Sequence, residues 1–177
     1  MKTETLKNGL ELTLRKAQPK DATAILSYLN RIGGESDNLT FGENGLNLPP
    51  EQEAAFIQSV NASKTSVMLV GFVEGEVACL GDLSASTKER LAHIGEVSVS
   101  VGKKFWRQGV GEQLMKALME FARDTGVLEL LHLGVKADNA GAIALYRKLG
   151  FTEYGRFPRF FHVNGQYYDE ILMYRML

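Results

Sequence analysis

A basic turn that contains glycines is the first segment of the chain whose residues could do chemistry. The residues from Gly102 to Gln108 include three basic side chains and are followed by Gly109-Val110-Gly111, at the start of a predicted helix. Backbone N–H groups at a helix N-terminus attract anions, and glycine lets a phosphate group approach the backbone closely. This pattern predicts a cradle for a pyrophosphate, but a tight strand-to-helix turn that binds nothing would show the same two glycines.

The residues around this turn restrict which phosphate compound could bind. A Rossmann fingerprint requires a third glycine at the position where Leu114 stands. A Walker loop ends in Gly-Lys-Ser or Gly-Lys-Thr, and neither sequence occurs in the chain. The sequence therefore disfavours dinucleotides and nucleoside triphosphates as ligands.

A second motif lies between Asn139 and Phe151 and has the pattern Asn-x-x-Ala-Ile-x-Leu-Tyr-x-Lys-x-Gly-Phe. Together with Gln108-Gly109-Val110-Gly111 and the order strand, turn, helix, strand, it resembles the GNAT superfamily of acyl-CoA-dependent N-acetyltransferases. The resemblance covers essentially the whole chain in element order. The acidic loop from Gly34 to Glu43 and the chain ending with Gly165 to Asp169 also resemble a bacterial branch of small GNAT enzymes.

The resemblance implies an α/β fold with a single mixed, mostly antiparallel sheet flanked by helices. Its central strands, 94–101 and 129–135, are expected to splay apart and admit the pantetheine arm of acetyl-CoA. The backbone of the first of these strands would pair with that arm, and the amides of the turn would hold the pyrophosphate. The implied cofactor-binding residues are Val99, Ser100, Val101, Arg107, Gln108, Gly109, Val110, Gly111, Glu112, Asn139, Ala142, Tyr146 and Lys148.

One residue departs from the pattern of the family. Trp106 stands where the family commonly has Gln or Arg, so the side-chain contact made at that position has no match here. Backbone amides do most of the phosphate binding, and we therefore still expect the cofactor to bind. Lys103, Lys104 and Arg107 add positive charge that suits its phosphates, although a solvated turn would look similar.

Acetyl transfer from a thioester to an amine needs a neutral amine, a stabilised oxyanion and a leaving thiolate. Deprotonating an alkyl ammonium of pKa about 10.4 at pH 7 costs about 4–5 kcal/mol, so a carboxylate acting through water would help. Glu96 borders the expected cleft and is the first candidate for this general base, although a solvated strand residue or an ion pair would look the same. The acidic loop offers Glu35, Asp37 and Glu43 as alternatives.

Tyr146 is the second candidate catalytic residue, because it matches the tyrosine beside the thioester sulfur in the family. A thiol of pKa about 8.5 is a weaker base than tyrosinate at about 10, so a hydrogen bond to the leaving thiolate is enough. A core aromatic between helix and sheet would show the same pattern. A backbone N–H of residues 99–101 would hold the oxyanion, and no metal is expected, since the three histidines are isolated.

The elements that position these residues follow from the spacing of apolar side chains. Residues 35–50 form a long polar segment, and Glu74-Gly75 and Asn164-Gly165 predict hairpin turns. We expect one domain over residues 1–177, with no repeat or linker. The predicted strands are 10–15, 66–73, 77–84, 94–101, 129–135, 154–163 and 167–176, and the predicted helices are 22–32, 51–60, 109–123 and 139–149.

Composition limits the partners and the compartment. The chain has 177 residues and a formal net charge of −1, so neither nucleic acid nor an anionic membrane is expected as a partner. Its single cysteine, Cys79, excludes an internal disulfide, is expected to be buried, and suits a cytoplasmic location. No apolar stretch is long enough to cross a membrane.

The expected partners are acetyl-CoA and an amine acceptor. The acidic loop favours a small cationic amine over a protein N-terminus. Two other functions stay open at this point: an acyl-CoA-binding regulatory module without catalysis, and a phosphate-binding protein of a different fold. A homodimer is also compatible with the resemblance, because Phe157, Phe160 and Phe161 could supply an apolar surface; they could equally belong to the core or to the acceptor pocket.

Overall fold

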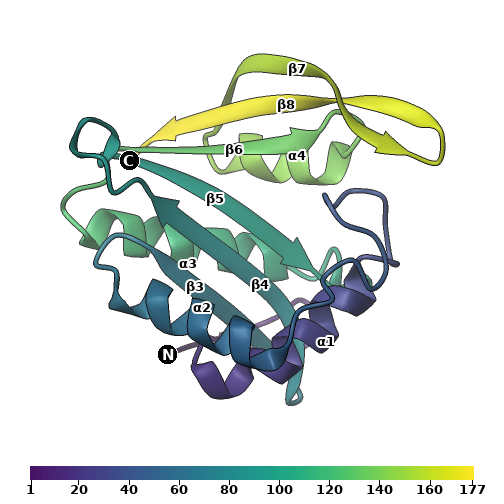
Figure 1. Cartoon of the computed structure of the whole chain (residues 1–177), viewed down its shortest axis with the longest axis vertical. Helices are drawn as coiled ribbons and strands as arrows, with labels where there is room; N and C mark the ends of the chain where they lie inside the picture. Colours follow the sequence, from purple (N-terminus) through teal and green to yellow (C-terminus); the bar gives the residue numbers. More distant parts are fainter.

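The eight strands of the protein form one mixed sheet, as seen in the computed structural model, which describes all residues from 1 to 177 (Figure 1). Their order in the sheet is β1-β2-β3-β4-β5-β6-β8-β7, and only β5 and β6 are parallel neighbours. This confirms the predicted fold class. The strands are β1 (Lys2–Thr5), β2 (Glu11–Lys16), β3 (Val67–Val73), β4 (Glu76–Ala85), β5 (Ile94–Val101), β6 (Leu130–Lys136), β7 (Thr152–Val163) and β8 (Gln166–Met176).

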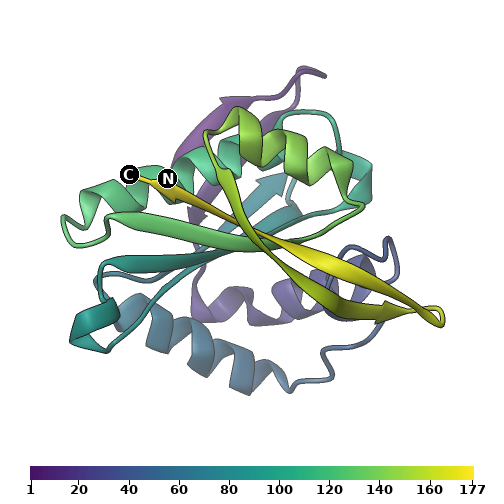
Figure 2. The same cartoon turned by 90° about the horizontal axis from the view of Figure 1, so that it is seen from above.

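Four helices cover the two faces of the sheet (Figure 2). On one face α1 and α2 pack against Met68, Val70 and Leu80 in one buried cluster. On the other face α3 lies over a larger cluster that includes Leu83 and Leu131. The helices are α1 (Ala22–Ile32), α2 (Pro50–Ala62), α3 (Val110–Asp124) and α4 (Ala140–Lys148).

Side-chain alternation in β4 determines which face each residue serves, because successive side chains in a strand point to opposite faces. Leu80 belongs to the cluster under α1 and α2, whereas Cys79 and Leu83 belong to the cluster under α3. Cys79 is fully buried, as predicted, and burial raises the pKa of its thiol to about 12. Asp82 shares the face of Leu80, which places a carboxylate among apolar neighbours.

The element boundaries agree with the sequence prediction to within a few residues, with one addition. The strand Lys2–Thr5 was not predicted, because its residues are charged or polar and show no apolar alternation. It pairs with β2 from Lys2 opposite Leu14 to Thr5 opposite Glu11. As an edge strand it buries little side-chain surface, so only backbone pairing defines it.

The two central strands separate, as the family resemblance implied. Parallel pairing between β5 and β6 ends where Glu96 lies opposite His132. Beyond that point β5 stays paired with β4 as far as Val101, while β6 follows β8 as far as Lys136 opposite Glu170. Figure 1 shows the two strands diverging, and the backbone edges that they turn toward each other are free for a ligand.

Candidate functional site

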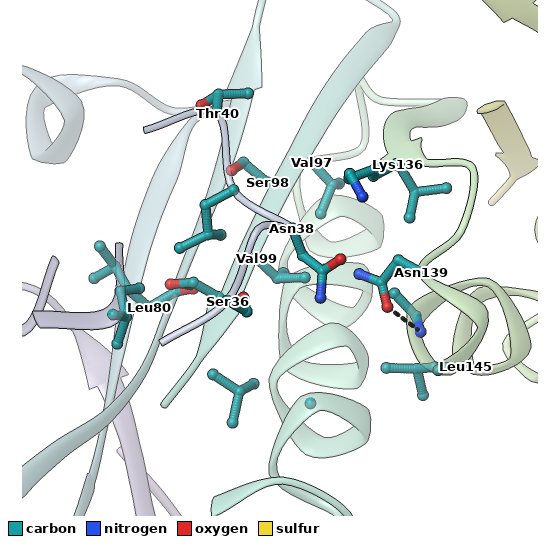
Figure 3. A pocket seen from close by; sticks show the side chains of 18 of the residues that line it. Ser36, Asn38, Thr40, Leu80, Val97, Ser98, Val99, Lys136, Asn139 and Leu145 are labelled. Atoms are coloured by element: carbon teal, nitrogen blue, oxygen red, sulfur yellow. Dashed lines mark hydrogen bonds between the residues drawn. The ribbon is translucent and has the colours of Figure 1, made fainter. Parts of the chain in front are cut away.

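A cavity of about 1010 Å³ occupies the opening between β5 and β6. Its lining comes from both sides of the sheet: the segment before α2 and parts of α1, α2 and β4 on one side, the first turns of α3 and α4 on the other. Figure 3 shows side chains from these elements around the same space, among them Ser98, Lys136 and Asn139. The part near α3 and α4 is called the donor half here, and the part near α1 and α2 the acceptor half.

The turn before α3 leaves its backbone donors free. None of the N–H groups of residues 107–112 donates a hydrogen bond within the chain. Arg107 and Gly109 have φ values of 62° and 97°, left-handed conformations that bend the chain sharply before the helix begins. Unpaired N–H groups at the N-terminus of a 15-residue helix form an anion-binding site. This geometry has the form of the predicted pyrophosphate cradle.

Two side chains of the turn serve to hold its shape. The Trp106 indole N–H donates a 2.7 Å hydrogen bond to the carbonyl of Val101, at the end of β5. The Gln108 amide donates to the carbonyl of Lys104 and accepts from Asn8, and Gln108 does not line the cavity. Trp106 therefore fixes the turn to the strand, and any phosphate contact of Gln108 comes from its backbone.

Ion pairs and a helix cap connect the other predicted donor-half residues. Glu112 bonds to Lys148 at 2.6 Å and to Lys116 at 2.8 Å, and these hydrogen bonds lower the pKa of Glu112 to about 2. Lys148 itself lies outside the cavity. The Asn139 side-chain oxygen accepts a 3.2 Å hydrogen bond from the Ala142 N–H and caps α4, while both residues line the cavity (Figure 3). Lys148 thus joins α4 to α3, and Asn139 keeps its amide nitrogen free.

Tyr146 combines burial with a free hydroxyl. Its side chain is only 6% exposed, its ring lies 6.0 Å from that of Phe151, and it lines the cavity. The phenol makes no hydrogen bond within the chain, and no buried side-chain polar atom lacks a partner, so the hydroxyl faces the open space. Burial raises the pKa of Tyr146 to about 12, which keeps it a neutral hydrogen-bond donor.

The predicted residues of β5 offer the donor half their backbone and, in the case of Val99 and Val101, apolar side chains. The Ser100 hydroxyl accepts a 3.1 Å hydrogen bond from Tyr28 of α1 and donates to the carbonyl of Leu80, so it faces the other side of the sheet. Val99 and Val101 pack against the cluster under α3. All three line the cavity, where β5 has no strand partner on this edge.

The four candidate general bases differ in their surroundings. Glu96 is exposed, lines the cavity and forms no ion pair. Glu35 also lines the cavity, but its carboxylate accepts from Arg31 at 2.5 Å and from the Lys103 N–H at 2.6 Å. Asp37 and Glu43 lie outside the lining. Glu96 is therefore the one of the four that is both free and within the cavity.

Three further carboxylates in the acceptor half were missed by the sequence analysis. Asp82 of β4 lies under α2 and Glu53 lies in α2, and burial, reinforced by the charge of Glu53, raises the pKa of Asp82 to about 7. Glu170 of β8 has its pKa raised by burial and by the charge of Glu96. Asp82 interrupts the otherwise apolar run 77–83, and this was a sequence signal that the residue has a special role. Nothing in the local sequence distinguishes Glu53 or Glu170 from surface residues.

Lys136 is a buried cation in the cavity wall, with only 3% of its surface exposed. Its ammonium group bonds to both carboxylate oxygens of Asp138, at 2.7 and 2.6 Å, and lies 3.5 Å from the centre of the Tyr168 ring. Its charge is therefore already neutralised by the protein.

No group of three or more His, Cys, Asp or Glu side chains is arranged to hold a metal, and no helix is long and apolar enough to span a bilayer.

Three of the known proteins that this chain resembles illustrate the similarity. The L-methionine sulfoximine/L-methionine sulfone acetyltransferase of Pseudomonas paraeruginosa is 36% identical over 167 residues, which cover 93% of this chain and 94% of that protein. A GNAT-family acetyltransferase from Streptococcus pneumoniae has a TM-score of 0.91 at 31% identity, covering 94% of this chain and 99% of that one. A phosphinothricin acetyltransferase from Sinorhizobium meliloti, in complex with acetyl-CoA, has a TM-score of 0.81 at 20% identity, covering 94% and 88%.

A model of the acetyltransferase (GNAT) family matches residues 37–151, which include the cradle and the motif beginning at Asn139. The relatives that cover most of the chain are named as acetyltransferases, which confirms the expected class of enzyme, an acyltransferase. The chain belongs to the acetyltransferase (GNAT) family.

Proposed function

We propose that this protein transfers the acetyl group of acetyl-CoA directly to a primary amine, without a covalent enzyme intermediate. The observation that carries the proposal is the convergence of three features on one cavity: the unpaired N–H groups of residues 107–112, the free hydroxyl of Tyr146 and the free carboxylate of Glu96. The first suits a pyrophosphate, the second a leaving thiolate and the third an ammonium that must lose a proton.

In this proposal each group of the site has one role in the reaction. The backbone of Val99 to Val101 pairs with the pantetheine arm and offers an N–H to the oxyanion. The cradle holds the phosphates, and the amide of Asn139 contacts the arm as it passes α4. Glu96 accepts the amine proton through water, and Tyr146 donates a hydrogen bond to the thiolate.

The acceptor in this proposal is a small cationic amine. Glu53, Asp82, Glu96 and Glu170 line the acceptor half, while its one basic residue, Lys136, is paired with Asp138. Such a surface attracts an ammonium and repels a carboxylate. The relative from Pseudomonas paraeruginosa is named for amino-acid acceptors, which carry a carboxylate, so we expect a different specificity here.

Two alternatives make different predictions. A regulatory module without catalysis would bind acetyl-CoA and release no thiol with any amine. An N-terminal acetyltransferase would prefer peptides to free amines.

The proposal also includes a cytoplasmic location and a homodimer formed through the exposed rings of Phe157 and Phe160.

Thermal unfolding in the presence of acetyl-CoA, coenzyme A, ATP or NAD is the first test. At a hundredfold excess over its dissociation constant, a ligand of the native state adds about 2.7 kcal/mol, which is about 5–10 °C for a chain of this size. We expect this shift with acetyl-CoA and not with NAD, followed by amine-dependent thiol release. The absence of a shift with acetyl-CoA would contradict the proposal.

A further inference from the structure

Asp82 and Glu53 meet in the acceptor half from two different elements. Asp82 lies in the middle of the sheet, opposite Met68 on β3 and Ser98 on β5. Glu53 lies in the first turn of α2, one helical turn before the fully buried Ile57, and so faces the sheet. Both line the cavity, and they are close enough for the charge of Glu53 to act on Asp82.

Neither carboxylate has a partner within the chain. Glu53 is 7% exposed, yet the only influence on its pKa is burial, which raises it, and it makes no hydrogen bond or ion pair. Asp82 likewise accepts no hydrogen bond through its side chain. The influences on its pKa are burial and the like charge of Glu53, and both raise it. Leaving a buried carboxylate unpaired is costly, and two close together repel each other. Stability alone does not account for this arrangement.

The protein supplies no cation to neutralise them. Three basic residues line the cavity. Lys136 is held by Asp138, while Arg107 belongs to the cradle and Lys7 is anchored beside it through a backbone hydrogen bond to Gln108. A positive charge for Asp82 and Glu53 must therefore come from a ligand.

We propose that Asp82 and Glu53 bind a second ammonium group of the acceptor, so that the substrate is a diamine or a longer polyamine. This inference rests on the proposed function and specifies its acceptor. The reacting nitrogen lies near Glu96, and the second nitrogen lies under α2. The free carboxylates then gain the hydrogen bonds and the charge that the protein does not provide.

Strand geometry sets the spacing of the two nitrogens. Asp82 pairs with Ser98, and Glu96 precedes Ser98 by two residues on the same face of β5. Two residues of strand advance about 7 Å and neighbouring strands are about 4.8 Å apart, which places the α-carbons of Asp82 and Glu96, whose side chains leave the same face, about 8 Å from each other. An alkyl chain of about four to six carbons spans that distance.

Calorimetric titration in the presence of coenzyme A tests the subsite without requiring turnover. The probes are diaminopentane and pentylamine, which have the same carbon chain and differ in the second ammonium. We expect the wild-type protein to bind diaminopentane about 10- to 100-fold more tightly, the range of a charge-assisted hydrogen bond. Asp82→Asn and Glu53→Gln should each reduce this ratio toward one. Glu51→Gln, on the exposed side of α2, should preserve it.

Three results would overturn the subsite: equal affinity of the two amines for the wild-type protein, no binding of diaminopentane, or an unchanged ratio in both Asp82→Asn and Glu53→Gln. Thermal unfolding of the variants verifies that each is folded. Turnover is measured separately. If pentylamine and diaminopentane are acetylated equally well, the subsite is wrong and the proposed function stands. If diaminopentane binds through Asp82 and no amine is acetylated, the subsite stands and the proposed function is wrong.

Discussion

The carboxylate of Glu170 lies directly over the α-carbon of Gly134, on the strand beside it. A methyl group at Gly134 would occupy the position of that carboxylate. The absence of a side chain at Gly134 thus lets Glu170 reach the place where β5 and β6 separate, within reach of the charge of Glu96. Two carboxylates, Glu96 and Glu170, therefore face the cavity at the point where β5 and β6 separate.

Gly134→Ala is expected to displace Glu170 and to lower kcat by about tenfold, because small misplacements near reacting groups are costly. Stability should change little, since the displaced atoms end a flexible side chain. Steady-state kinetics and the pH–rate profile report the effect. Gly42→Ala is the control, since a methyl group there meets nothing within 4 Å. An unchanged kcat and profile would remove Glu170 from the catalytic centre.

Glu96→Gln should shift the pH–rate profile and lower kcat by about 100-fold, the lower end of the range for general-base catalysis. The amide cannot accept the amine proton, while its similar shape leaves the strand intact. The measurement is kcat across pH with a saturating amine. If Glu96→Gln leaves the profile as it is, the base is another carboxylate, and Glu170→Gln becomes the variant to compare.

Tyr146→Phe should reduce kcat by about 10- to 100-fold and leave acetyl-CoA binding nearly unchanged. The lost hydroxyl makes no hydrogen bond within the chain, so stability should also be preserved. Stopped-flow measurement of thiol release separates the chemical step from binding. Tyr154→Phe, at a ring that is 55% exposed, provides the matched control. Full activity in Tyr146→Phe would assign Tyr146 to the core alone.

Gly109→Val should weaken acetyl-CoA binding. Gly109 has a φ of 97°, and a β-branched residue there strains the backbone by about 1–2 kcal/mol and distorts the cradle. Gly9→Val is a control with comparable strain, because Gly9 has a φ of 84° and also has open space around it. Both variants should lose stability, but only Gly109→Val should lose affinity in calorimetry. Equal affinity of the two variants would place the pyrophosphate elsewhere.

The parts of this protein that are predictable from sequence are those fixed by local rules. Glycines at a helix start and the motif beginning at Asn139 identify the donor half, because its contacts lie within short segments. The acceptor half is assembled from α2, β4 and β8, and its carboxylates approach one another only through the sheet order. Glu53 has the sequence surroundings of a surface residue, and only the packing of α2 on the sheet buries it.

Asp82→Asn should stabilise the protein without ligands in a pH-dependent manner. The pKa of Asp82 is raised from 3.8 to about 7, so between these values the folded protein keeps a proton that the unfolded chain has released. Wild-type stability therefore falls as pH rises through this window and levels off above pH 7. Asparagine does not titrate, and its advantage should be absent below about pH 4 and reach about 4 kcal/mol above pH 7, the free-energy equivalent of raising the pKa from 3.8 to about 7.

Urea unfolding of both proteins at several pH values measures this difference. Removing the charge of Asp82 also removes its repulsion of Glu53 in α2, whose pKa is likewise raised by burial. Both changes stabilise Asp82→Asn relative to the wild-type protein. A gain that is independent of pH would mean that Asp82 is not the group that titrates. A gain that appears above about pH 4 and grows up to pH 7, together with lost diamine affinity, would show that the protein gives up stability to keep an unpaired carboxylate for its substrate.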